Sequence, residues 1–168
     1  KNQLKNFLEE SKKKNLKITI LGAGSNTLFR DNGVKGAVIK LGKDFSFTEI
    51  IDENTLNVGA ATLDRKVANF AKDNNLGNLE FLSCIPGSIG GAVIMNSGCY
   101  DNDISKVLLS IQAIDKNTLS EIEIKKEDIK FFYRGTNLPK DLIIISAKFK
   151  GIYSKKDNIE KKQLELIE

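Results

Sequence analysis

Apolar residues recur along the chain with the two spacings that distinguish helices from strands. A helical spacing places four residues on one face of residues 2–13, which predicts a helix there. A second stripe follows Thr62, a candidate N-cap, and ends at Gly77. Residues 154–168 are highly charged and only weakly helical in pattern. The two stripes consist of Leu4, Phe7, Leu8 and Ser11, and of Leu63, Val67, Phe70 and Ala71.

Apolar runs and alternating patterns predict more strands than helices. The predicted strands are residues 17–21, 37–41, 45–51, 55–58, 107–115, 119–124 and 141–150. Polar turns at residues 52–54 and 116–118 join two consecutive pairs of these strands, so each pair should form a hairpin. Residues 126–129 are expected to form a single helical turn. The mixture predicts an α+β fold, and neither an internal repeat nor a low-complexity linker interrupts it.

The composition narrows the classes of function. The 168 residues, 40% of them hydrophobic, suit one domain or one domain with part of another. No apolar run approaches the ~20 residues of a membrane span, so no membrane association is expected. The net charge of +4 comes from lysines spread along the chain, and aromatic residues are not interleaved with them. This pattern argues against a nucleic-acid partner.

The absence of histidine excludes several kinds of chemistry. The chain has no histidine general base, no histidine-dependent triad and few means of holding a transition metal, so no metal site is expected. A flavin attached covalently through histidine is excluded as well. Two cysteines, Cys84 and Cys99, without a signal peptide indicate a reducing cytosol rather than a disulfide framework.

The segment Leu21–Asn26, LGAGSN, directly follows a predicted strand. Glycines one residue apart let the backbone turn sharply and bring bare N–H groups close to an anion. A Rossmann loop fits poorly, because Thr27 holds the third glycine position and two turn glycines replace the long helix that should follow. In addition, no acidic residue ends a second strand. A tight turn that binds nothing is the alternative.

A second glycine-rich segment, CIPGSIGGAVIMNSGCY, spans residues 84–100. Four of its glycines fall within twelve residues, which is more than a hairpin turn requires. Such a backbone suits contact with a large flat ligand, with a helix start supplying N–H donors. Close packing of a helix on a sheet is the alternative without a ligand. If both segments serve one ligand, they must converge on a single cleft.

Three motifs, in this order and spacing, resemble the UDP-N-acetylenolpyruvoylglucosamine reductases, also called UDP-N-acetylmuramate dehydrogenases. They are LGAGSNTLFRDNGVKGAVIKL, IPGSIGGAVIMNSGCY and FFYRGTNLP. The resemblance implies an FAD-binding domain of the vanillyl-alcohol-oxidase/PCMH type over residues 1–150. Its two subdomains would be about residues 1–60 and 61–150, with FAD bound non-covalently between them. Residues 151–168 would lead into a C-terminal substrate domain that the chain lacks, so the domain would be truncated at both ends.

The resemblance also implies the residues that contact the cofactor. The first glycine segment would wrap the pyrophosphate through main-chain N–H groups. The second would lie along the pyrophosphate, ribityl chain and isoalloxazine. The implied cofactor-binding residues are Gly22, Ala23, Gly24, Ser25, Asn26, Thr27, Ile85, Pro86, Gly87, Ser88, Gly90, Gly91, Ala92, Asn96, Gly98 and Tyr100.

The implied activity is an NADPH-dependent oxidoreductase of peptidoglycan precursor synthesis in the bacterial cytoplasm, and so of cell wall biogenesis, cell shape and cell division. NADPH would reduce FAD, which would pass hydride to an enolpyruvyl UDP-sugar and give UDP-N-acetylmuramate. Arg134 would be catalytic and, with Tyr133, would bind the substrate, because a fixed guanidinium suits a carboxylate or a developing enolate. The proton donor would lie in the missing domain. Full turnover is therefore not expected from this chain, and a monomer is expected.

The sequence leaves two alternatives to this function. One is a different FAD oxidoreductase of the same fold that acts on an alcohol or a sugar. The other is a non-catalytic nucleotide-binding fragment. Flavin occupancy of the purified protein and bleaching of the flavin by NADPH would distinguish these hypotheses.

Overall fold

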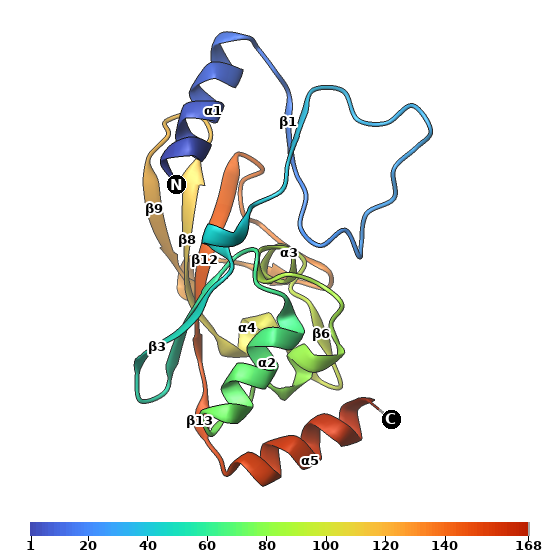
Figure 1. Cartoon of the computed structure of the whole chain (residues 1–168), viewed down its shortest axis with the longest axis vertical. Helices are drawn as coiled ribbons and strands as arrows, with labels where there is room; N and C mark the ends of the chain where they lie inside the picture. The colour runs from blue at the N-terminus through green and yellow to red at the C-terminus, as the bar shows by residue number, and fades with distance from the viewer. Residues whose placement is uncertain (168) are drawn as a thin grey trace.

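The computed structural model describes residues 1–167 and is built around one antiparallel sheet of five strands (Figure 1). The strands, in spatial order, are β3 (Thr48–Asp52), β4 (Thr55–Gly59), β12 (Leu142–Lys150), β8 (Leu108–Asp115) and β9 (Glu121–Lys125). Every neighbouring pair is antiparallel. The two predicted hairpins are therefore confirmed, since β3 pairs with β4 and β8 pairs with β9. The α+β class is confirmed as well.

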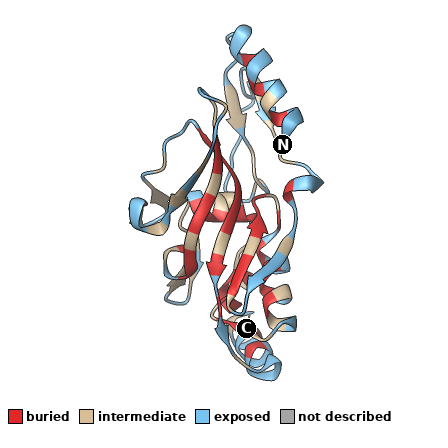
Figure 2. Ribbon diagram, turned by 90° about the vertical axis from the view of Figure 1, so that its left-hand side faces the viewer, coloured by how far each residue is buried: buried red, intermediate tan, exposed pale blue. Residues whose placement is uncertain are grey.

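The central strand β12 is buried on both of its faces, which explains its long apolar run. Ile144, Ala147 and Phe149 belong to the larger of two core clusters. Ile143 and Ile145 belong to the smaller one. Figure 2 shows buried residues along the middle strands of the sheet. A strand covered on both sides needs apolar residues at successive positions rather than alternate ones.

Short helices cover the face of the sheet that holds the larger core. They are α2 (Asp64–Asp73), η2 (Glu80–Cys84), α3 (Ile89–Ile94) and α4 (Ile104–Val107). Helix α1 (Asn2–Lys13) covers the smaller core, where Leu4 and Leu8 pack with Ile114 and Ile143. None of the helices in residues 1–167 combines the length and apolar character that crossing a bilayer requires.

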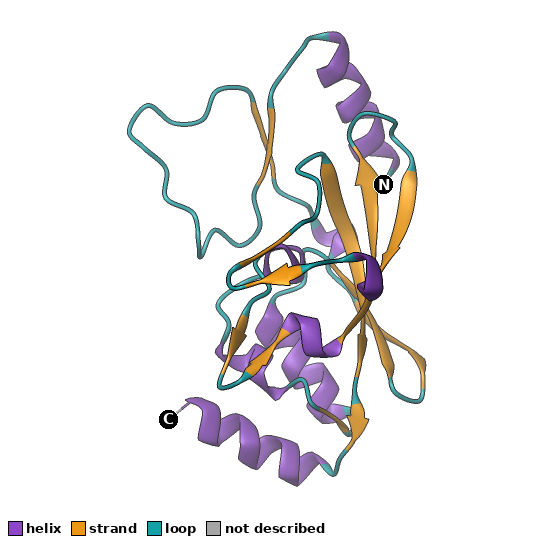
Figure 3. Cartoon of the chain, turned by 180° about the vertical axis from the view of Figure 1, so that it is seen from behind, coloured by secondary structure: helices purple, strands orange, loops and turns teal. Residues whose placement is uncertain are grey.

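A parallel pair of short strands, β1 (Ile18–Ile20) and β2 (Ala37–Ile39), lies beside the main sheet. The connection between them, residues 21–36, is an extended loop that projects from the molecule (Figure 3). It begins with the first glycine segment. Leu28 within it is 95% exposed, so this connection contributes little to the core.

The remaining elements are short strands, 3₁₀ turns and one C-terminal helix. They are η1 (Lys43–Phe45), η3 (Lys126–Asp128), β5 (Leu76–Gly77) paired with β13 (Ile152–Tyr153), β6 (Gly98–Cys99) paired with β7 (Asn102–Asp103), and β10 (Phe131–Phe132) paired with β11 (Gly135–Thr136). The 3₁₀ turn η3 confirms the helical turn predicted at residues 126–129. Helix α5 (Lys156–Ile167) packs against η2 and α2, and it buries Ile159.

Two of the sequence predictions about α2 are wrong. Thr62 does not cap this helix, because its hydroxyl donates to the carbonyl of Phe47 at 2.9 Å and Leu63 takes the N-cap position. The helix also ends at Asp73 rather than at Gly77. Asn75 has a φ of +58°, in the left-handed region, and such a residue terminates a right-handed helix.

The strand predicted from Phe45 to Ile51 starts later than expected. Lys43–Phe45 form the 3₁₀ turn η1, and this turn buries Phe45 in the smaller core. The strand β3 therefore begins only at Thr48. Burial of one aromatic ring against the sheet overrides the local strand preference of these residues.

Candidate functional site

The two glycine segments meet at one cleft of about 570 Å³. All six residues from Gly22 to Thr27 line it. From the second segment, the lining residues are Ile85, Gly87, Ser88, Gly90, Gly91, Ala92, Ile94, Met95 and Ser97. The segments approach so closely that a Cβ added to Gly22 would lie 2.9 Å from the Ser88 hydroxyl oxygen. The prediction that both segments converge on a single cleft is confirmed.

The first segment presents several main-chain N–H groups that have no acceptor within residues 1–167. Of the N–H groups of residues 22–27, only that of Thr27 donates to an acceptor in residues 1–167, the Gly24 carbonyl at 3.2 Å. Gly24 has a φ of +91°, which a residue with a side chain rarely adopts. Alternation of backbone conformation in such a turn aims successive N–H groups into one concavity, and this arrangement binds anions.

The second segment is held against the sheet by its own backbone. The Gly90 N–H donates to the Ala60 carbonyl at 2.9 Å, and a Cβ added to Gly90 would lie 3.1 Å from the Cβ of Ala60. Gly91 differs, because a Cβ there would meet only the Ser88 hydroxyl at 4.0 Å. The missing side chain of Gly90 permits close packing, whereas that of Gly91 leaves open the space next to the cleft.

A buried carboxylic acid lies directly behind this second segment. Asp64, at the start of α2, is 0% exposed, and neither of its carboxyl oxygens has a hydrogen-bond partner in residues 1–167. One of these oxygens would lie 2.5 Å from a Cβ added to Gly87. Burial raises the pKa of Asp64 to about 7. Sequence reasoning missed this residue, since an aspartate in the first turn of a helix is ordinarily a solvated, dipole-stabilised group.

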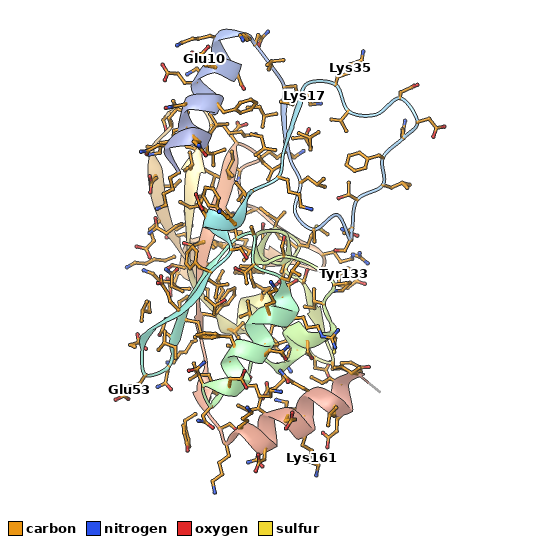
Figure 4. All side chains as sticks on the ribbon, in the orientation of Figure 1. Glu10, Lys17, Lys35, Glu53, Tyr133 and Lys161 are labelled. Atoms are coloured by element: carbon orange, nitrogen blue, oxygen red, sulfur yellow. The ribbon has the colours of Figure 1, made fainter. Side chains whose placement is uncertain are left out.

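Arg134 reaches the first glycine segment from another part of the chain. It sits in the turn between β10 and β11 with a φ of +58°, and its guanidinium donates to the Asn26 side-chain oxygen at 3.1 Å. Arg134 itself does not line the cleft. Its neighbour Tyr133 is 93% exposed and points away from the protein (Figure 4). The arginine is therefore placed beside the rim of the cleft, where it faces solvent.

Four other predicted cofactor residues lie outside the cleft lining: Pro86, Asn96, Gly98 and Tyr100. Asn96 has a bridging position instead. Its side-chain oxygen accepts from the Ser105 N–H at 3.0 Å, and its amide donates to the Phe132 carbonyl at 3.4 Å. It thus connects the start of α4 to the hairpin that carries Arg134. Direct cofactor contact by these four residues stays a prediction.

Strand ends and loops complete the cleft with residues that sequence reasoning did not select. They are Ile18, Ile20, Leu21, Lys40, Leu41, Ala60, Ala61, Leu63, Ile94, Met95, Ser97, Lys116, Leu138, Pro139, Lys140, Leu142, Ile143 and Ile144. Most are apolar, and they come from distant parts of the sequence. Some lie within the three quoted motifs and others lie outside them, and only the tertiary fold brings the whole set together.

Comparison with known proteins identifies the kind of domain that carries this cleft. The family model described as FAD binding domain matches residues 1–118. The UDP-N-acetylenolpyruvoylglucosamine reductase of Pelagibacter ubique is 48% identical over 97% of this chain, and that of Rickettsia felis is 46% identical over 93%. The chain spans 52% of the length of each of these relatives.

The solved structures agree with the sequence comparison. The UDP-N-acetylenolpyruvylglucosamine reductase of Thermus caldophilus superposes with a TM-score of 0.81 at 29% identity, covering 95% of this chain and 58% of that one. The 6-hydroxy-D-nicotine oxidase of Arthrobacter nicotinovorans superposes with a TM-score of 0.64 at 13% identity, over 87% of this chain and 33% of that one. The second similarity concerns the fold alone.

Proposed function

Since the chain belongs to the FAD-binding domain family, we propose that it is the flavin-binding part of a UDP-N-acetylenolpyruvoylglucosamine reductase. The observation that carries this proposal is the single cleft in which two remote glycine segments meet. The relatives at 46–48% identity bear the name of that enzyme. The proposed activity is the reduction of an enolpyruvyl UDP-sugar to UDP-N-acetylmuramate, with NADPH as the reductant.

The residues present suit FAD. The N–H groups of Gly22–Asn26 are available to the diphosphate, and the apolar walls of the cleft suit the flat ring systems. The whole predicted set from residues 22–27, 85–88, 90–92, Asn96, Gly98 and Tyr100 is proposed to contact the cofactor. The proposed binding is non-covalent, and the absence of histidine from the chain removes one residue type that can attach a flavin covalently. The two proposed subdomains, between which FAD would bind, are about residues 1–60 and 61–150.

Bound FAD supplies hydride chemistry, which amino-acid side chains cannot provide. The role proposed for this chain is to position and polarise. Arg134 would bind the substrate carboxylate, because a guanidinium offers two parallel donors to a carboxylate. Its hydrogen bond to Asn26 supports this role by holding it beside the proposed cofactor segment. Tyr133 is exposed and is proposed to contact the substrate.

The rest of the reaction is proposed to depend on a part of the protein outside this chain. The relatives are about twice as long as the matched region. We propose that residues 151–168 lead towards the substrate domain of the complete enzyme and that this domain supplies the proton donor. NADPH and UDP-sugars are cytoplasmic metabolites, so the proposed location is the bacterial cytoplasm.

Flavin binding is the first test of the proposal. The purified protein is expected to be yellow, or to bind added FAD at a ratio of one to one with quenching of flavin fluorescence. Riboflavin should bind more weakly, because it lacks the diphosphate that the first glycine segment is proposed to hold. The proposal would be refuted if the protein is folded, as judged by circular dichroism, and does not bind added FAD.

Substitution of Arg134 tests the catalytic part. In the complete enzyme, Arg134→Gln is expected to lower kcat/KM for the enolpyruvyl substrate by about 100-fold or more, as the loss of one charge-stabilising donor does. Arg134→Lys should restore only part of the rate. FAD affinity should change little, since Arg134 does not line the cleft. An unchanged rate in Arg134→Gln would contradict the role.

A further inference from the structure

The cleft has an unusual charge pattern. Among the described residues that line it, the ionisable ones are three lysines, Lys40, Lys116 and Lys140, and none is acidic. The whole chain is far more balanced, with 26 basic and 22 acidic residues. A concave site lined by one sign of charge concentrates ligands of the opposite sign. The lining therefore indicates an anionic ligand.

The fold brings two of these lysines to the same end of the main sheet, and the third follows a strand of the neighbouring pair β1–β2. Lys116 directly follows β8 and Lys140 shortly precedes β12, and the pairing of Asp115 with Leu142 places these two strand ends side by side. Lys40 directly follows β2, whose Ile39 packs into the smaller core with Ile143 of β12. Three separate segments thus contribute one lysine each.

Two of the three lysines have no counter-charge within the described chain. The Lys116 ammonium lies 3.4 Å from the Asp141 carboxylate, and its side chain is only 17% exposed. No carboxylate of residues 1–167 lies within ion-pairing distance of Lys40 or Lys140. A cationic group left without a partner at a cleft is available to an anion. Lys40 and Lys140 are therefore the two lysines most available to an anion, and Lys116, which already has a partner, is the third cation of the cleft lining.

We propose that Lys40, Lys116 and Lys140 form a phosphate-binding rim that holds the diphosphate half of the dinucleotide, together with the N–H groups of Gly22–Asn26. This inference rests on the proposed function, because it takes FAD as the occupant of the cleft. The diphosphate is the charged part of FAD, whereas the isoalloxazine and adenine rings are neutral. The rim adds side-chain cations to a site whose other donors are main-chain groups.

The rim should make binding sensitive to phosphate and to salt. Mobile ions screen exposed charge pairs, so FAD affinity should fall as ionic strength rises. ADP, which carries the diphosphate without a flavin, should compete with FAD. Riboflavin, which carries no phosphate, should bind with an affinity that depends on neither the lysines nor the salt concentration.

The test measures FAD binding by fluorescence quenching at low and at moderate salt, with ADP and riboflavin as competitors. Lys40→Gln and Lys140→Gln are each expected to weaken FAD and ADP binding by roughly 3- to 10-fold, and the double variant by roughly 10- to 100-fold. The double variant should also lose most of the salt dependence. Arginine at both positions should restore affinity to within about 3-fold.

Lys161→Gln provides the matched control. Lys161 lies on α5, away from the cleft lining, and its side chain is 80% exposed (Figure 4). This variant changes the net charge by the same amount and should bind FAD as the unsubstituted protein does. If Lys161→Gln weakened FAD binding as much as Lys40→Gln or Lys140→Gln does, the effect would be one of net charge, and the proposed rim would be wrong.

Three other outcomes of the binding experiment distinguish a failure of the phosphate-binding rim from a failure of the proposed function. If the unsubstituted protein binds no FAD, the proposed function itself fails. If it binds FAD and the double variant binds it equally well with the same salt dependence, the function stands and the rim is wrong. If the double variant loses riboflavin binding to the same extent as FAD binding, the lysines shape the cleft without holding phosphate, and the rim is again wrong.

Discussion

Replacing Asp64 by asparagine is expected to stabilise the protein above neutral pH and to remove most of one pH-dependent contribution to its stability. In the folded protein, burial raises the pKa of Asp64 from 3.8 to about 7. Between these values the unfolded chain carries an ionised Asp64 while the folded one keeps it protonated. The stability contributed by this group therefore falls as pH rises from about 4 to about 7, and it stays low above that range.

The pKa difference corresponds to about 4 kcal/mol of unfolding free energy, lost progressively across that pH range. Urea unfolding at pH 5 and pH 8 would measure the part lost between these two values, about 3 kcal/mol, because pH 5 already lies within the range. Asp64→Asn should be more stable than the unsubstituted protein at pH 8, with little or no gain at pH 5. The amide still needs hydrogen-bond partners, so the gain at pH 8 should be smaller than the full 4 kcal/mol.

Asp73 on the same helix provides the control for this prediction. Its carboxylate is exposed and lies 2.7 Å from the Lys156 ammonium, which lowers the pKa of Asp73. Any contribution from Asp73 is present at high pH and is lost as pH falls, which is the opposite direction. Asp73→Asn should therefore give no stabilisation at pH 8. Parallel pH profiles for Asp64→Asn and the unsubstituted protein would show that Asp64 is not held neutral in the fold.

Replacing Gly59 by alanine is expected to destabilise the fold by about 3 kcal/mol or more, in the range of severe overpacking. Gly59 ends β4, and its N–H donates to the Phe47 carbonyl at 2.9 Å. An added methyl group would overlap the Phe45 carbonyl oxygen and would lie 2.6 Å from the carbonyl carbon. Main chain cannot rotate away as a side chain does, so the strand or the crossing segment must shift.

The same substitution should weaken FAD binding, because Ala60 and Ala61 follow directly and line the cleft. Gly42→Ala is the matched control. Gly42 has a φ of −85°, and a Cβ there would meet nothing within 4 Å, so the change in stability should stay within about 0.5 kcal/mol. Urea midpoints of both variants, with FAD titrations beside them, would test the prediction. Similar midpoints for the two variants would contradict it.

The elements that sequence predicted well are those that local pattern determines. Alternation and polar turns located both hairpins, and a continuous apolar run located β12, because burial on both faces imposes that run. The predicted ends of helices and strands were wrong where a tertiary contact determined where the element begins. The Thr62 hydroxyl bonds to the distant Phe47 carbonyl instead of capping a helix, and burial of Phe45 delays the next strand.

In the candidate site, too, some residues could be predicted from the local sequence and others could not, because tertiary contacts place them. Glycine spacing alone marked the two segments that meet at the cleft, since a backbone without side chains is visible in a sequence. Lys40, Lys116 and Lys140 look like ordinary surface lysines near strand ends, and only the strand order of the main sheet and the packing of β2 beside it bring them to one cleft. Asp64 has no sequence signal either, because its burial depends on the segment that packs over it.

The position of the cleft between the two hydrophobic clusters has a consequence for cooperativity. Ala92 and Ile144 line it from the larger cluster, whereas Ala61 and Ile143 line it from the smaller one. An occupant touches both, so its binding energy opposes the melting of either half on its own. A bound cofactor would therefore couple the two hydrophobic clusters, so that they unfold together in one cooperative transition.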